Sequence, residues 1–163
     1  AKAKNKLIFV GSSMGSWVAL NLISSFKKKT KGFIGISSAP DFLEELMWKK
    51  FNKKIKKIIM TKKIYNLKRD YFVYPITKQL IVDGRKNKIL NKKINNKISV
   101  TLLHGLKDNV VPLKFSIKTL KIFKNAKKKL IKIKNGDHSL SRNSDLKIIS
   151  KELSIMITNY NNL

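Results

Sequence analysis

The most constraining feature of this sequence is an uncharged stretch of 20 residues, Leu7 to Phe26, in a chain with a formal net charge of +28. Its length raises the question of a membrane span or a signal peptide. Eight of the 20 residues are Gly, Ser or Asn, however, and a hydrocarbon core disfavours the Gly and Ser cluster at 11–16. The stretch instead predicts a buried strand over 7–10, a tight turn, and a helix from about Met14 to Phe26.

Apolar segments farther along continue this alternation of strands and helices. The patterns predict strands over 32–36, 98–103 and 129–133, a helix over 113–123, and a last helix from about Asp145 with Ser144 as its N-cap. Alternation of this kind favours an α/β fold with a mainly parallel sheet that is covered by helices on both faces. We therefore expect 1–163 to form a single domain.

The region from about 41 to 97 differs in character, because it is rich in lysine and lacks this regular order. It predicts helical pieces over 41–51 and 53–63, with turns at Tyr74-Pro75 and Asp83-Gly84. We interpret the region as an excursion from the main sheet.

The segment Gly11 to Gly15 fits the pattern G-x-S-x-G between a predicted strand and a predicted helix, which is the setting of a nucleophile elbow. There Ser13 would occupy a strained turn with its hydroxyl exposed, and a side chain at position 11 or 15 would collide with the neighbouring strand or helix. The backbone N–H of Met14 would lie where a tetrahedral oxyanion forms.

Two other interpretations of the same turn have to be weighed: a plain Ser- and Gly-rich turn, and a phosphate-binding loop. The spacing is not the G-x-G-x-x-G of dinucleotide-binding loops, and the turn is not followed directly by the Lys-Ser or Lys-Thr pair that a P-loop needs. These differences favour the elbow.

A serine nucleophile needs a base, and the chain contains two histidines, His104 and His138. In this architecture the chain order is Ser, acid, His. Since His138 follows every plausible acid and lies in the loop after the last predicted strand, we expect it to be the base. His104, at the end of the strand over 98–103, is expected to be a packed, hydrogen-bonded structural residue.

The acid has to come from nine carboxylates. Asp108 follows the strand over 98–103, beside the expected position of the His138 loop, and we expect it to orient the imidazole. Asp137 adjoins His138 in the chain, where neighbouring side chains diverge, and is expected to brace the loop. Asp41 and Asp83 are weaker candidates.

The composition excludes some classes of function and leaves the meaning of the charge open. Because the chain has no Cys, it can hold no disulfide, cysteine zinc site or cysteine nucleophile. We separately expect no metal and no cofactor. Lys, Asn and Ile fill 70 of the 163 positions, which is typical of A+T-rich coding sequence, and 34 of the 37 basic residues are Lys. Base composition is therefore the first interpretation of the charge. A lysine-rich scaffold that binds anionic partners is the alternative function.

Six ordered segments resemble the α/β-hydrolase family that contains the mitochondrial palmitoyl-protein thioesterase, also described as mycophenolic acid acyl-glucuronide esterase, and its bacterial relatives. The segments are 10–17, 35–42, 46–48, 83–85, 104–112 and 136–142. The resemblance implies a three-layer α/β-hydrolase fold with a helical lid over about 41–97. It also implies hydrolysis of acyl esters or thioesters by Ser13, Asp108 and His138.

The same resemblance implies the partners and the substrate pocket. The substrate would be a small acyl ester or thioester, or an acylated protein, with no specific nucleic-acid partner and no transmembrane segment. Phe42, Met47 and Trp48 would line the acyl pocket, although each also fits a plain helix core. The protein would be cytoplasmic in a bacterium and mitochondrial in a eukaryote.

One departure from the family concerns the start of the chain. In the family several strands precede the elbow strand, and a His-Gly loop supplies a second oxyanion N–H. Here six residues precede Leu7 and the first residue is Ala. We therefore expect that the natural N-terminal part is missing, that the strand over 7–10 forms an exposed edge, and that the second donor is absent, which would lower turnover by about 10² to 10³.

Overall fold

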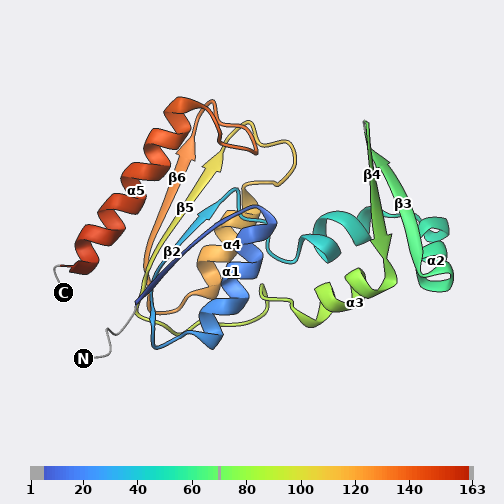
Figure 1. Cartoon of the computed structure of the whole chain (residues 1–163), viewed down its shortest axis with the longest axis horizontal. Coiled ribbons are helices and arrows are strands. Elements are labelled where there is room, and N and C mark those ends of the chain that lie inside the picture. Colours follow the sequence, from blue (N-terminus) through green and yellow to red (C-terminus); the bar gives the residue numbers. More distant parts are fainter. Residues whose placement is uncertain (1–5, 70, 162–163) are drawn as a thin grey trace. The chain divides into compact units, whose positions relative to one another are not determined.

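The computed structural model describes residues 6–69 and 71–161 (Figure 1). These residues divide into two compact units, one drawn from 1–40 and 89–163 and the other from 41–88. We call them the sheet unit and the inserted unit. The predictions that the whole chain forms one domain, and that the excursion is a lid, stay predictions.

The sheet unit is built on four parallel strands in the order β1-β2-β5-β6. The expected strands are all present within a few residues of their predicted bounds: β1 (Leu7–Ser12), β2 (Thr30–Ile36), β5 (Ser99–Gly105) and β6 (Lys127–Ile133). Because the strands are parallel, their carboxyl ends lie at one edge of the sheet, where α/β proteins bind ligands.

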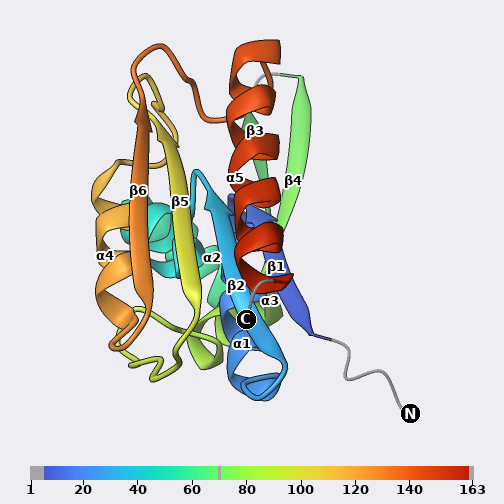
Figure 2. The same ribbon diagram turned by 90° about the vertical axis from the view of Figure 1, so that its left-hand side faces the viewer.

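Three helices cover the sheet, in agreement with the expected α/β class. Figures 1 and 2 show α1 (Met14–Ser25) and α4 (Lys114–Ile122) on one face and α5 (Asn143–Asn161) on the other. The prediction of Ser144 as N-cap is wrong. The Arg142 carbonyl already accepts the N–H groups of Asp145 and Leu146, so Ser144 lies inside the first turn of α5.

Because successive side chains of a strand point to opposite faces of the sheet, the sheet unit has a hydrophobic core on each face. On the α5 side the buried cluster comprises Ile34, Ile36, Leu103, Ile133, Leu140 and Met156. On the opposite side Phe33 of β2 stacks on Phe123, which follows α4, with ring centroids 6.1 Å apart. Since side chains alternate between the two faces, consecutive residues of β2 enter different cores, which explains its nearly continuous apolar sequence.

The inserted unit has its own small core, which comprises Ile59, Ile76 and Ile81. The expected helical pieces are present. In chain order the elements are η1 (Leu43–Met47), η2 (Trp48–Lys50), α2 (Lys53–Lys62), β3 (Ile64–Arg69), β4 (Phe72–Thr77) and α3 (Lys78–Lys86).

Both turns predicted in this region are wrong. Tyr74 and Pro75 lie inside β4, which pairs with β3 alone in a two-stranded sheet, and such edge positions tolerate a proline without an N–H. Asp83 and Gly84 lie inside α3, where Gly84 is buried. Packing therefore overrides the weak helix propensity of glycine.

Two leucines on α1 test the packing of the sheet unit. Leu20 is fully buried, whereas Leu22 is 40% exposed. We expect Leu20→Ala to lower the free energy of unfolding by about 2–5 kcal/mol, because it leaves a cavity. Leu22→Ala is the matched control and should change this free energy by less than about 1 kcal/mol. Urea denaturation measures both, and equal losses would contradict the observed orientation of α1.

Candidate active site

Ser13 lies on a strained turn between β1 and α1, as expected. Its φ is 48° and its ψ is −117°, a conformation that L-residues rarely adopt. The end of β2 and the segment that follows it hold this turn through two backbone hydrogen bonds. The Ser13 N–H donates to the Ile36 carbonyl at 2.8 Å, and the Ser13 carbonyl accepts the Ala39 N–H at 3.3 Å. These contacts keep the turn in place at the carboxyl edge of the sheet.

The two glycines of the elbow differ in what surrounds them. A Cβ added at Gly11 would lie 2.6 Å from backbone atoms of Gly15 and Ser16, so the expected collision is confirmed there. The same expectation for Gly15 is wrong, because, apart from its chain neighbours and the backbone of its own helix, no described atom lies within 4 Å of a Cβ added there. The turn thus requires a glycine at its first position but not, for steric reasons, at its last.

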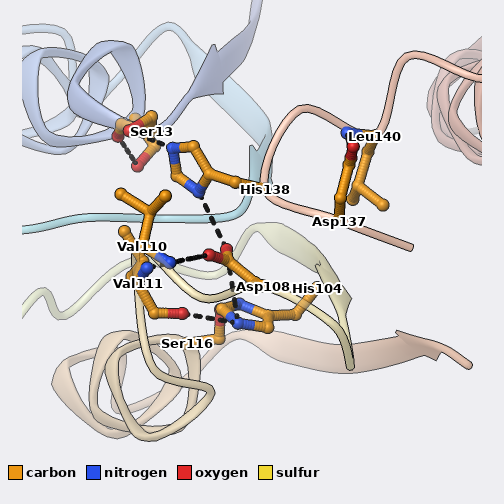
Figure 3. Close-up of polar contacts among 10 residues, drawn as sticks. Ser13, His104, Asp108, Val110, Val111, Ser116, Asp137, His138 and Leu140 are labelled. Atoms are coloured by element: carbon orange, nitrogen blue, oxygen red, sulfur yellow. Dashed lines mark hydrogen bonds and ion pairs between the residues drawn. The ribbon is translucent and has the colours of Figure 1, made fainter. Parts of the chain in front are cut away.

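The structure brings together the three side chains that the sequence predicts for the triad (Figure 3). His138 Nε2 lies 3.0 Å from Ser13 Oγ, and His138 Nδ1 lies 2.8 Å from Asp108 Oδ2. Because a carboxylate only accepts, the neutral imidazole carries its proton on Nδ1 and leaves Nε2 free to accept from the serine hydroxyl. The catalytic roles of these residues stay a prediction at this point.

Asp108 is held as a charged group in a buried position. Its Oδ1 accepts the N–H groups of Val110 and Val111 at 2.9 and 2.8 Å. Burial alone would raise the pKa of the Asp108 carboxyl. The hydrogen bonds from the Val111 N–H, from His138 and from the Val110 N–H outweigh burial, and the net pKa lies below its ordinary value. Asp108 is therefore a carboxylate at neutral pH.

A contact between two glycines sets the distance between the Asp108 loop and the His138 loop. A Cβ added at Gly105, at the end of β5, would overlap the carbonyl oxygens of Gly136 and Asp137. A backbone hydrogen bond stabilises the contact, since the Gly136 carbonyl accepts the Lys107 N–H at 2.8 Å. This contact was not predicted from the sequence, although Gly105 and Gly136 lie close to the ends of β5 and β6 and could have indicated it.

His104 is packed and hydrogen-bonded, as expected. Its Nδ1 lies 2.8 Å from Ser116 Oγ, and its Nε2 lies 3.0 Å from the Val111 carbonyl oxygen. Since that carbonyl only accepts, Nε2 carries the proton and Nδ1 accepts from Ser116. Burial lowers the pKa of His104 against the attraction of Asp108, so the ring is neutral.

Asp137, Asp83 and Asp41 are the other candidate carboxylates. Asp137 Oδ1 accepts the Leu140 N–H at 3.0 Å, which braces the loop as expected, and Figure 3 shows its side chain turned toward Leu140. Asp83 is on α3 and accepts from Gln79, and Asp41 is buried at the start of the inserted unit.

The remaining predicted site residues belong to helix ends and to the inserted unit. Met14 is the first residue of α1, where backbone N–H groups have no acceptor within the helix. Met47 and Trp48 pack beside the core of the inserted unit, and Phe42 is half-buried just before η1. Their roles as oxyanion donor and as acyl-pocket residues stay predictions.

Neither a metal site nor a membrane helix is found in the part of the chain that the structure describes. No group of three or more His, Cys, Asp or Glu side chains there could hold a metal ion. None of the helices in residues 6–69 and 71–161 combines the length and apolar character needed to cross a bilayer.

The sequence resembles curated thioesterases, although no family model matches it. It is 28% identical over 153 residues to the mitochondrial palmitoyl-protein thioesterase ABHD10 of Bos taurus, and the match covers 90% of this chain and 49% of the bovine protein. It is 27% identical over 148 residues to the human protein of the same name, and this match covers 87% of this chain and 47% of the human protein. The chain thus spans about half the length of the curated relatives that it matches.

Solved structures decide the fold. A putative hydrolase from Agrobacterium vitis S4 superposes with a TM-score of 0.87 at 28% identity and covers 94% of this chain and 62% of its own. The mouse α/β-hydrolase domain-containing protein 10 has a TM-score of 0.84 at 26% identity, and the match covers 98% of this chain and 64% of the mouse chain. The fold is that of an α/β-hydrolase. The resemblance proposed from the six sequence segments is therefore confirmed.

The unequal surroundings of the two elbow glycines in this fold give a paired prediction. We expect Gly11→Ala to lower the free energy of unfolding by about 1–3 kcal/mol, because its methyl group meets backbone that cannot give way. Gly15→Ala should leave this free energy unchanged or raise it by up to about 1 kcal/mol, since alanine favours a helix. Urea denaturation of the two variants checks this, and a reversed order would contradict the observed elbow.

The neutral His104 predicts a pH dependence of stability. Its pKa is lower in the folded chain than the ordinary 6.5 of an unfolded one, so the unfolded state binds more protons between those two values. Above about pH 6.5 His104 makes its full contribution to the free energy of unfolding, and this contribution is lost as the pH falls toward the pKa of His104 in the folded chain. The loss has a slope of at most about 1.4 kcal/mol per pH unit.

His104→Gln tests this dependence, because the Gln amide can still donate to the Val111 carbonyl but does not titrate. The free energy of unfolding of this variant should fall less steeply than that of the wild type between pH 7 and 5. Urea titrations at each pH give the two slopes. Identical slopes would show that His104 is not the group responsible.

Proposed function

We propose that this chain carries the catalytic centre of a serine hydrolase that cleaves carboxylic esters or thioesters through an acyl-enzyme on Ser13. The observation that chiefly supports the proposal is the continuous series of hydrogen bonds from Ser13 through His138 to Asp108. A positive φ at Ser13, at the end of a strand, adds to it, because a nucleophile elbow needs such a turn.

The proposed mechanism follows from the proton positions. Nε2 of His138 takes the hydroxyl proton while Ser13 Oγ attacks the acyl carbonyl, and the resulting imidazolium then protonates the leaving group. Water attacks the acyl-enzyme with the same imidazole as base. Asp108 holds Nδ1–H in place and stabilises the imidazolium, while the Met14 N–H would donate to the oxyanion.

The substrate class is proposed from the relatives. The bovine and human proteins are named palmitoyl-protein thioesterases, which supports an acyl thioester or ester as the substrate and makes a long acyl chain the first to test. The inserted unit would form the lid, with Phe42, Met47 and Trp48 contributing an apolar wall for that chain. No metal or cofactor enters the proposed mechanism.

A fluorophosphonate probe tests the nucleophile directly. It phosphonylates an activated serine, so we expect the wild-type chain to be labelled and Ser13→Ala to show no labelling by in-gel fluorescence and mass spectrometry. Ser24→Ala is the control, because Ser24 is an exposed serine of the adjoining helix α1 and its loss should leave labelling unchanged. Labelling that persists in Ser13→Ala would contradict the proposal.

The acid gives a second test on the same chain. Asp108→Asn keeps the shape of the side chain but favours the wrong imidazole tautomer, and should lower the turnover of a p-nitrophenyl acyl ester by about 10⁴ relative to wild type. Asp137→Asn is the matched control, since an amide oxygen can still accept the Leu140 N–H, and it should stay within a few-fold of wild type. Equal effects of the two variants would refute the assignment of Asp108.

A further inference from the structure

The outer half of the β3–β4 hairpin exposes a run of apolar side chains. Tyr71 is 101% exposed, Phe72 65%, Val73 55% and Tyr74 47%. We call Tyr71 to Tyr74 the hairpin patch. Single exposed apolar residues are normal on a protein surface, whereas contiguous exposed apolar patches mark sites of interaction with another molecule.

The register of the hairpin shows that Phe72 and Tyr74 of the patch continue a core face. Phe72, Tyr74 and Ile76 alternate along β4, so they share one face, and Ile76 is buried in the core of the inserted unit. Farther out the same face carries Phe72 and Tyr74, whose rings touch with centroids 6.2 Å apart. Figure 1 shows the two strands extending beyond α2. The hairpin is therefore anchored at its base and uncovered at its end.

The segment that leads into the patch is strongly basic. From Leu46 to Arg69 there are ten basic residues and no acidic one. Lys68 lies opposite Val73 in the ladder, so a positive charge borders the patch directly. Exposed lysines continue along α2 and its end: Lys53, Lys54, Lys57, Lys62 and Lys63.

We propose that the hairpin patch and these lysines dock on the surface of an anionic lipid bilayer. Tyr and Phe rings favour the boundary between headgroups and acyl chains, and an aliphatic side chain such as Val73 gains by burial there. The lysines are attracted by acidic headgroups within a Debye length.

Single-stranded nucleic acid fits the same surface less well. Bases stack on aromatic faces, but Val73 in the middle of the patch offers no such face. The membrane proposal goes beyond the hydrolase activity and does not depend on it, because none of these residues belongs to the triad.

Vesicle co-sedimentation tests the proposal with the full chain. We expect binding to phosphatidylcholine vesicles that contain 30% phosphatidylserine, and at least ten-fold weaker binding to pure phosphatidylcholine. Tyr71→Ser combined with Phe72→Ser should weaken binding to the anionic vesicles at least ten-fold without changing the urea midpoint. Ile155→Ser combined with Ile157→Ser on α5 removes two exposed apolar residues elsewhere and should leave binding unchanged.

A second pair of variants separates the local charge from the net charge. Replacing Lys53, Lys54 and Lys57 by Glu should weaken binding at least ten-fold, whereas the same change at Lys114, Lys118 and Lys121 of α4 should weaken it much less. If both variants lost the same amount of vesicle binding, the binding would depend on net charge alone, and the proposal would be overturned. Unchanged binding by the Tyr71 and Phe72 variant would overturn it as well.

Two further measurements complete the test. Binding of a fluorescent 30-nucleotide DNA strand that the patch variant abolishes, without vesicle binding by the wild type, would assign the surface to nucleic acid and overturn the membrane proposal. Ser13→Ala should bind anionic vesicles as the wild type does. Failure of the hydrolase proposal would therefore leave the vesicle result intact, and the reverse also holds.

Discussion

The approach of two backbones at Gly105 and Gly136 fixes the geometry on which the candidate site depends. Parallel pairing of β5 with β6 brings both strand ends to one edge, and the missing side chains let the following loops touch. The Gly136 carbonyl then accepts the Lys107 N–H, one residue before Asp108 and two residues before His138. The 2.8 Å contact between these two side chains thus follows from main-chain pairing. A methyl group at Gly105 or Gly136 would therefore change the distance between Asp108 and His138 by moving the two loops.

Ser13 reaches the same place by a different route, through β2. A positive φ in a non-glycine residue costs about 1–3 kcal/mol and persists only where its surroundings hold it. Here the Ile36 carbonyl and the Ala39 N–H hold the turn from one side, while Ser16 Oγ donates to the Ser13 carbonyl at 2.7 Å from the other. The strained residue is therefore supported by β2 and by the first turn of α1, and its hydroxyl remains available to His138.

The three side chains that meet in the candidate site could be predicted from the sequence because the candidates for them are scarce. With two histidines and nine carboxylates, chain order and strand ends were enough to select Asp108 and His138. The α/β alternation could also be predicted, since β1, β2 and β5 each contain an apolar run, and Leu130, Ile131 and Ile133 mark β6 among its lysines. The β3–β4 hairpin was missed, because its pairing depends on contacts of Ile76 with residues of two helices rather than on local pattern. The open space at Gly15 likewise depends on what surrounds the turn, which no motif encodes.

The net charge of +28 and the buried carboxylate act over different distances. Exposed lysines interact through water, where charges more than about 10 Å apart are largely screened at 0.1 M ionic strength. Asp108 is buried and touches the imidazole at 2.8 Å, so its attraction is screened far less. The contact between Asp108 and the imidazole is therefore maintained beside a lysine-rich surface, provided that Asp108 stays ionised. The hydrogen bonds that lower the Asp108 pKa below its ordinary value meet that condition.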